Sequence, residues 1–113
     1  MDANAPDLKS WRQATQLVRG GLKRSAFAET SEGLFMTSGY IYETAESAER
    51  AFKGEEERYI YSRYANPTVA MFEERLALLE GAEVCRATAS GMAAVFAALL
   101  CQLKAGDRLV ASR

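Results

Sequence analysis

Residues 84–111 read VCRATASGMAAVFAALLCQLKAGDRLVA, and this stretch decides the expected fold. The pattern predicts a strand at Val84–Thr88, a helix at Met92–Leu103 and a second strand at Arg108–Ala111, with turns at 89–91 and 105–107. A strand, a helix and a further strand in this order make one βαβ crossover, with parallel strands and a right-handed connection. The sequence therefore predicts the start of an α/β fold.

The predicted helix is apolar on all sides. Between Gly91 and Cys101 no side chain is charged, and such a helix must be covered by other elements on every face. The sequence also ends at Arg113, directly after the second predicted strand. We therefore expect the chain to be the N-terminal part of a larger α/β enzyme, or to rely on partner subunits for its core.

The first half of the chain has a weaker pattern, and the sequence divides near residue 65. A modest helical pattern over residues 7–19 stops at Gly20-Gly21, which is typical of a helix end followed by a turn. From Leu22 to Tyr42 the apolar residues show no regular spacing. This segment is expected to be an extended arm that needs another surface to lie on.

A short helix is predicted after the arm. Thr44 is a suitable N-cap, Glu46 lies in the first turn, and the helix should end at Gly54. The acidic run 55–57 is interpreted as a solvated loop.

A longer helix is predicted from Asn66-Pro67-Thr68 onward. Asn66 or Thr68 can cap it, and the ring of Pro67 fixes a backbone angle suited to a first helical turn. Its expected apolar stripe, which ends before Gly81, consists of Val69, Phe72, Leu76 and Leu79.

Composition excludes several kinds of chemistry. The 113 residues include no histidine, which removes histidine-based catalytic arrangements and metal sites. With 14 basic and 15 acidic side chains, the net charge of −1 gives no reason to expect nucleic acid or a membrane surface as a partner. Cys85 and Cys101 have neither redox nor metal-ligand spacing and are interpreted as reduced core residues. The N-terminus shows no export signal, so a cytoplasmic location is expected.

The turn Ala89-Ser90-Gly91-Met92 is a candidate anion site. It falls between the carboxyl end of a predicted strand and the amino end of the next helix, where open parallel sheets bind ligands. Free N–H groups and the helix dipole attract phosphate at such a position. The sequence matches neither the dinucleotide fingerprint nor a Walker A loop, and small residues here also serve tight packing alone.

A second candidate is the aromatic and basic segment from Tyr59 to Thr68, YIYSRYANPT. An arginine among tyrosines, with no apolar period, indicates a loop that displays a planar cation and phenolic hydroxyls, which suits a phosphate or carboxylate. The alternative is a set of surface aromatic residues with an ordinary ion pair.

Together these segments resemble a known family. Tyr61-Ser62-Arg63 with Asn66-Pro67-Thr68, then 79–82 (LEGA) and 89–94 (ASGMAA), are similar in order and spacing to the trans-sulfuration family of pyridoxal-phosphate (PLP) enzymes. That family includes cystathionine synthases and lyases, methionine lyase and homoserine-ester sulfhydrylases. The resemblance extends over residues 14–113. Residues 14–21 and 37–40 are most similar to its O-succinylhomoserine sulfhydrylase branch.

The resemblance implies a fold-type-I enzyme with a mainly parallel sheet and helices on both faces. Residues 1–65 would form an arm that contacts a neighbouring subunit, and 66–113 the start of the PLP-binding domain. Members of the family are homotetramers built from active dimers. The implied cofactor-binding residues are Tyr61, Arg63, Ser90, Gly91 and Met92. Gly91 and Met92 would offer N–H groups to the phosphate, while Tyr61 and Arg63 would reach the phosphate held by the neighbouring chain.

No catalytic residue is expected in this chain, because the Schiff-base lysine of the family lies downstream of Arg113. Lys9, Lys23, Lys53 and Lys104 are interpreted as surface residues. The implied reaction uses PLP, an O-succinyl- or O-acetyl-homoserine and sulfide to make homocysteine, and the chain alone is expected to be inactive. Alternatives are a cystathionine γ-synthase or γ-lyase, a non-catalytic oligomerisation or phosphate-binding module, and an unrelated phosphate-binding α/β domain.

Overall fold

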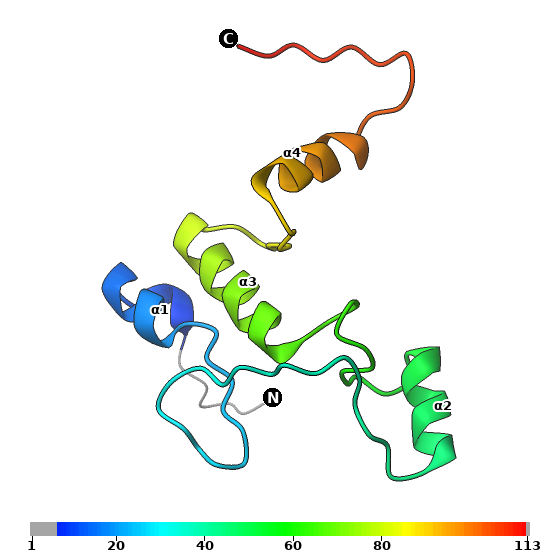
Figure 1. Cartoon of the computed structure of the whole chain (residues 1–113). Coiled ribbons are helices and arrows are strands. Elements are labelled where there is room, and N and C mark those ends of the chain that lie inside the picture. The colour runs from blue at the N-terminus through cyan, green and yellow to red at the C-terminus, as the bar shows by residue number, and fades with distance from the viewer. Residues whose placement is uncertain (1–6, 113) are drawn as a thin grey trace.

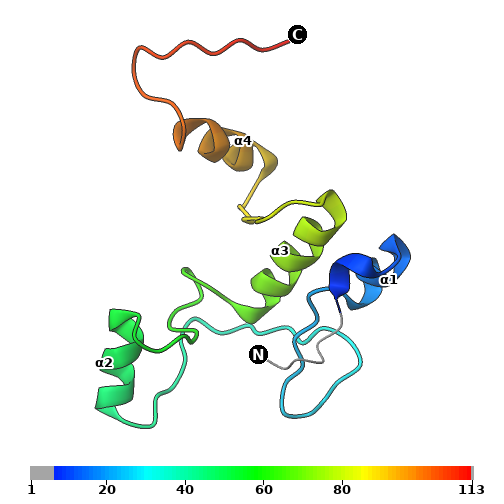
Figure 2. The same cartoon turned by 180° about the vertical axis from the view of Figure 1, so that it is seen from behind.

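The computed structural model describes residues 7–112 as four α-helices and one 3-10 turn joined by long loops (Figure 1). The turn η1 spans Leu8–Ser10, and the helices are α1 (Gln13–Arg19), α2 (Ala45–Lys53), α3 (Pro67–Glu80) and α4 (Gly91–Leu100). Helix α1 packs on α3, while α2 and α4 lie beyond opposite ends of α3 (Figures 1 and 2). Residues 1–6, on which the absence of an export signal rests, and Arg113 lie outside the described residues.

Helix caps follow the sequence prediction closely. The hydroxyl of Thr44 accepts from the first turn of α2, and the side chain of Asn66 accepts from the first turn of α3, with Pro67 as its first residue. Both helices end at glycines in the left-handed region, Gly54 with φ 76° and Gly81 with φ 62°. These backbone angles strain other residues, which explains why the two helices stop there.

The N-terminal helix is shorter than predicted. Trp11 and Arg12 are extended (ψ 150° and 144°), so the expected helix over 7–19 divides into η1 and α1. The carboxylate of Asp7 caps η1 separately by accepting from the N–H of Lys9 at 3.1 Å. The amide of Gln16 then donates to the carbonyl of Leu8 at 3.0 Å and ties the two pieces together.

The buried face of α3 differs from the predicted stripe. Val69 and Phe72 are 42% and 56% exposed, whereas Met71 is 2% exposed. The chain after α1 packs so closely on the Met71 side that a Cβ added to Gly20 would lie 2.8 Å from a methyl carbon of Leu78. The helix is apolar on two sides, and periodicity alone does not show which side meets α1.

The two predicted strands are not formed, which corrects the expectation of a βαβ pair within this chain. Residues 84–88, before α4, and residues 108–111, after it, form no strand pairing with any other segment of the described chain. An isolated antiparallel bridge joins Gly39 and Tyr61. Parallel strands are stable when both faces are covered. Here α4 does not cover either segment. The helix predicted at Met92–Leu103 forms as α4, Gly91–Leu100, and a turn forms within residues 105–107 as predicted.

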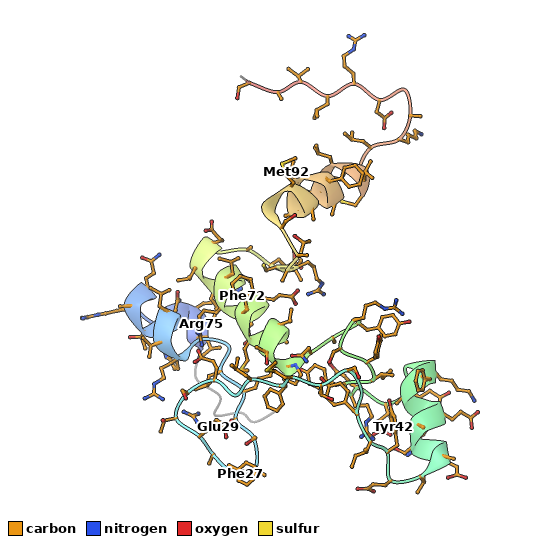
Figure 3. All side chains as sticks on the ribbon, in the orientation of Figure 1. Phe27, Glu29, Tyr42, Phe72, Arg75 and Met92 are labelled. Atoms are coloured by element: carbon orange, nitrogen blue, oxygen red, sulfur yellow. The ribbon has the colours of Figure 1, made fainter. Side chains whose placement is uncertain are left out.

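Residues 7–112 do not form a closed core. The radius of gyration is 17.7 Å, whereas a compact domain of this length has about 13 Å. Met92 and Phe96 of α4 are 74% and 63% exposed, and Met92 points into open space (Figure 3). Cys101 is also exposed, so its interpretation as a core residue is wrong for this chain, while Cys85 is half-buried.

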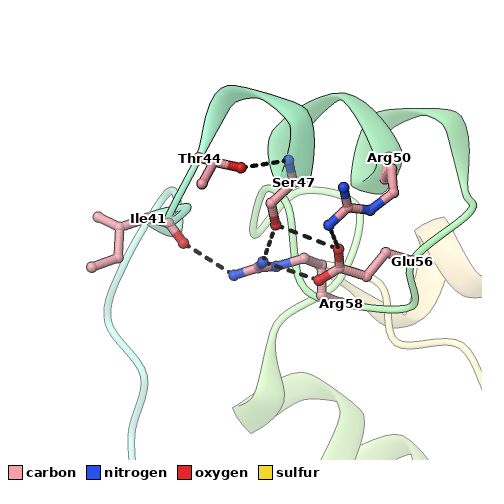
Figure 4. A network of polar contacts seen from close by, with 6 residues as sticks. All are labelled: Ile41, Thr44, Ser47, Arg50, Glu56 and Arg58. Carbon is pink, nitrogen blue, oxygen red and sulfur yellow. Dashed lines mark hydrogen bonds and ion pairs between the residues drawn. The ribbon is translucent and has the colours of Figure 1, made fainter.

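A polar network connects α2 to Ile41, near the end of the extended segment 22–42 (Figure 4). Glu56 pairs with Arg50 at 3.4 Å and with Arg58 at 3.1 Å, and Arg58 donates to the hydroxyl of Ser47 and the carbonyl of Ile41, each at 3.1 Å. The prediction of a solvated acidic loop is therefore wrong for Glu56, because both arginines lie near enough to hold it. Its two acidic neighbours are exposed as expected.

Candidate functional site

The turn at residues 61–64 displays the predicted tyrosine and arginine. The N–H of Tyr64 donates to the carbonyl of Tyr61 at 2.9 Å, which closes the turn. Residues 38–39 of the extended segment 22–42 support the turn: Gly39 forms a β-bridge with Tyr61, and the N–H of Ser62 donates to the carbonyl of Ser38 at 2.9 Å. Residues 38–39, more than twenty positions away in the sequence, therefore hold the 61–64 turn in place.

Arg63 is exposed and available for a ligand. Its guanidinium lies 5.3 Å from the ring centre of Tyr61 and 5.6 Å from that of Tyr64, within the range of cation–π attraction. Within residues 7–112 it makes no ion pair. A planar cation held against two rings, with its N–H groups free, suits a phosphate or carboxylate.

A pocket of about 480 Å³ lies beside this turn. Its rim includes Arg63, Arg86 and Glu73, and Tyr59, Asn66 and Ala87 also line it. Arg86 is paired with Glu73 at 3.5 Å, so Arg63 is the cation of the pocket that no carboxylate engages within the described chain.

The second predicted element, the loop at residues 90–92, begins helix α4. The hydroxyl of Ser90 accepts from the N–H of Ala93 at 3.2 Å and caps the helix, while the carbonyl of Ser90 accepts from the N–H of Ala94 at 3.1 Å. The N–H groups of Gly91 and Met92 have no partner within residues 7–112, as expected for a first turn. A Cβ added to Gly91 would meet no heavy atom within 4 Å, so the backbone at this residue is not crowded.

The structure does not bring the two predicted elements together within one chain. No hydrogen bond or ion pair of the described residues joins Tyr61 or Arg63 to the 90–92 loop, and the pocket beside Arg63 reaches Ala87 but not the loop. Instead, Glu73 of α3 holds the segment before the loop by accepting from the N–H of Ala87 at 2.7 Å. Helix α3 therefore supports both elements, one at its N-terminus and one at its middle.

Sequence reasoning missed two residues of this support. Asn66 was expected only as a helix cap, and Glu73 was not singled out. The Asn66 amide also donates to the carbonyl of Phe35 at 2.9 Å, and Thr68 accepts from the N–H of Phe35 at 2.8 Å. Asparagine offers both a donor and an acceptor, which is the one signal in the sequence for this second contact.

Two carboxylates of the arm have perturbed acidity, both away from the candidate site. The N–H of Ser25 at 2.8 Å, backbone hydrogen bonding at Glu29 itself and the hydroxyl of Ser25 at 2.7 Å, in this order of size, hold the pKa of Glu29 below its ordinary value. Backbone hydrogen bonding at Glu32 and the guanidinium of Arg75 likewise lower the pKa of Glu32. Glu29 closes the loop that carries Phe27 at its tip (Figure 3).

In residues 7–112 no three His, Cys, Asp or Glu side chains gather in a way that could hold a metal ion. None of the helices in this part of the chain is both long and apolar enough to cross a membrane.

The two elements together have the donor set of a protein that binds a phosphate-bearing ligand: two free N–H groups at a helix N-terminus, and a free guanidinium beside two phenol rings. Comparison with known proteins makes this class specific. The family profile "Cys/Met metabolism PLP-dependent enzyme" matches residues 14–113, and the chain belongs to this family. The resemblance found in the sequence is thereby confirmed, as is PLP as the cofactor of the family.

Named relatives agree with this assignment. The chain is 61% identical over 101 residues to O-succinylhomoserine sulfhydrylase of Mycobacterium tuberculosis, which covers 89% of the chain and 25% of the relative. It is 47% identical to O-succinylhomoserine sulfhydrylase of Pseudomonas aeruginosa, over 95% of the chain and 27% of the relative. It is 40% identical to L-methionine gamma-lyase of Porphyromonas gingivalis, over 88% and 25%. The chain thus spans about a quarter of the length of these relatives.

Solved structures share the arrangement of the helices. A putative O-acetylhomoserine (thiol)-lyase of Campylobacter jejuni, which carries a pyridoxyl-lysine phosphate, matches with a TM-score of 0.77 and 32% identity. Apo CalE6, a methionine gamma lyase of Micromonospora echinospora, matches with a TM-score of 0.66 and 30% identity. Each match covers 86% of this chain and 23% of the other. These matches agree with the expected fold-type-I class, although the described chain itself has no sheet.

Proposed function

We propose that this chain is the N-terminal quarter of a PLP-dependent O-succinylhomoserine sulfhydrylase. The enzyme is a transferase that makes homocysteine from an activated homoserine ester and sulfide, with succinate or acetate as the leaving group. The observation that carries this proposal is the 61% identity to O-succinylhomoserine sulfhydrylase of Mycobacterium tuberculosis over 89% of the chain.

The residues of the chain fit the phosphate of the cofactor. The N–H groups of Gly91 and Met92 are free and point from a positive helix end, Ser90 holds that helix end in shape, and the backbone at Gly91 is not crowded. Arg63 and Tyr61 add a free cation and a hydroxyl. When bound, pyridoxal phosphate supplies the electron sink for chemistry at the substrate carbon atoms. This chain's own part is to bind and orient the phosphate.

We propose that the two elements serve cofactors in different subunits. The 90–92 loop binds the phosphate in its own chain, and the 61–64 turn reaches the phosphate held by a neighbour. Within residues 7–112 no hydrogen bond or ion pair joins the two elements, and the pocket beside Arg63 does not reach the 90–92 loop, which fits this division. Phe27, Met36 and Ile41 of the arm are each more than 90% exposed, which fits an arm that lies on a neighbouring subunit of a homotetramer.

The 113-residue chain alone is proposed to be inactive. Its four lysines, Lys9, Lys23, Lys53 and Lys104, are all exposed. Lys53 pairs with Glu49 on α2, and Lys23 donates to the hydroxyl of Tyr59 at 3.3 Å. None of the four amines is therefore desolvated, and desolvation is a common way to make a lysine a nucleophile. The covalent attachment of the cofactor therefore falls to a lysine outside residues 1–113.

The alternative is a cystathionine γ-synthase or γ-lyase of the same family. The 40% identity to L-methionine gamma-lyase of Porphyromonas gingivalis supports the γ-lyase alternative. Assays of the full-length protein distinguish these functions. The proposal expects homocysteine from O-succinylhomoserine and sulfide, and little cystathionine when cysteine replaces sulfide. Cystathionine from cysteine without homocysteine from sulfide, or breakdown of methionine without either product, would overturn it.

A further inference from the structure

We propose that Asn66 is a positioning residue for the cofactor, acting through Tyr61 and Arg63, and this inference rests on the proposed function. Asn66 touches no ligand-facing atom of either side chain. Its amide holds the back of the 61–64 turn while its carbonyl oxygen caps α3. The buried side chain of Asn66 thus fixes the position of the 61–64 turn relative to α3.

Both polar atoms of the Asn66 side chain are engaged in hydrogen bonds. Its Oδ1 accepts from the N–H of Thr68 at 2.9 Å, and its Nδ2 donates to the carbonyl of Phe35 and to the hydroxyl oxygen of Ser62, each at 2.9 Å. The residue is 7% exposed, so water does not replace a lost partner easily. Three segments of the chain therefore meet at one amide group.

Ser62 passes this constraint to the turn. Its hydroxyl accepts from Asn66 and donates to the carbonyl of Thr37, and its N–H donates to the carbonyl of Ser38 at 2.9 Å. Ser62 is thereby held toward the arm and α3. Its two neighbours, Tyr61 and Arg63, are exposed, as is Tyr64, and Arg63 gains its orientation from its contacts with the rings of Tyr61 and Tyr64.

Asparagine and aspartate separate the two roles of this position. Both residues cap helices about equally well, so Asn66→Asp keeps the bond to Thr68. The substitution replaces the Nδ2 donor with an acceptor, which then faces the carbonyl of Phe35 and the oxygen of Ser62. Helix α3 should still begin at residue 67, but the turn should lose its fixed position.

The experiment measures the affinity of the full-length apoprotein for pyridoxal phosphate by absorbance titration, together with the melting temperature of the apoprotein. We expect Asn66→Asp to weaken cofactor binding about tenfold. In a Tyr61→Phe/Arg63→Ala background the same change should weaken binding less than twofold further, because the groups it positions are gone. Ser62→Ala, which keeps the cap, should weaken binding threefold to fivefold and serves if Asn66→Asp does not fold.

Thr44→Ala removes the cap of α2, away from the turn, and should lower the melting temperature without changing cofactor affinity. Unchanged affinity in both Asn66→Asp and Ser62→Ala would overturn the positioning role while leaving that of Arg63 standing. A tenfold effect of Asn66→Asp that persists in the Tyr61→Phe/Arg63→Ala background would also overturn it. If that background itself binds normally, the proposed cofactor contacts fail first.

Discussion

Gly91→Asp is predicted to abolish tight binding of pyridoxal phosphate and to leave the protein at least as stable as before. Gly91 is the first residue of α4, its φ lies outside the left-handed region, and an added Cβ meets nothing within 4 Å. The new side chain therefore causes neither clash nor strain. A carboxylate in the first turn of a helix contributes about 0.3–1 kcal/mol of stability through the helix dipole.

The loss of cofactor affinity follows from charge. A phosphate bound to the N–H groups of Gly91 and Met92 would lie next to the introduced carboxylate. Two negative unit charges about 4 Å apart repel each other by about 4 kcal/mol at an effective dielectric constant of about 20. Rotation of the side chain and screening by salt reduce this, so we expect affinity to fall at least about 100-fold, or about 2.8 kcal/mol.

The assay compares the full-length apoprotein of three forms: the parent, Gly91→Asp and Gly91→Ala. Cofactor affinity comes from absorbance titration and stability from thermal unfolding without cofactor. Gly91→Ala adds the Cβ without the charge and should bind within a few-fold of the parent. Unchanged affinity in Gly91→Asp would refute the assignment of the phosphate to this loop. A clear drop in melting temperature would refute the inference that the backbone at Gly91 is not crowded.

Further substitutions and pH test other parts of the account. Arg63→Ala should weaken cofactor binding by about 2 kcal/mol, or about 30-fold, while Arg86→Ala, whose side chain is already paired, should change it less than threefold. Equal effects of the two would contradict the special role of Arg63. Tyr61→Phe should lower kcat more than it lowers melting temperature; equal losses would indicate a structural tyrosine. Because the pKa of Glu29 is depressed, its bonds to Ser25 are complete above pH 4.5 and are lost as the pH falls further. Hydrogen exchange at Ser25, corrected for its intrinsic rate, should report that loss, and Glu29→Gln should remove the pH dependence.

Local features of this fold follow from the sequence because each depends on neighbouring residues. Thr44 and Asn66 have side chains that accept from the next turn, and Gly54 and Gly81 tolerate the backbone angle that ends a helix. The helix expected at Met92–Leu103 is α4, which begins one residue earlier at Gly91 because the side chain of Ser90 caps it, and which ends at Leu100. The 61–64 turn and the 90–92 loop were found as candidates through residue type and order.

Features that depend on distant segments could not be predicted in this way. The choice of Met71 over Phe72 as the buried side of α3 depends on where the chain after α1 packs. The strand pattern at 84–88 remains unpaired because pairing requires neighbouring strands and cover on both faces. The contact from Asn66 to Phe35 joins residues 31 positions apart, and a capping motif does not specify it.

Subunit mixing tests the central claim most directly, namely that one cofactor site is built from two chains. Arg63→Ala and Gly91→Asp subunits of the full-length protein, carrying different tags, are co-expressed, and oligomers containing both are purified. In such a pair, the intact 90–92 loop of one subunit meets the intact Arg63 of the other. The account predicts one tight pyridoxal-phosphate site per unlike pair, although each variant alone binds weakly. No tight site in the mixed oligomer would contradict it, because Arg63 would then act within its own chain.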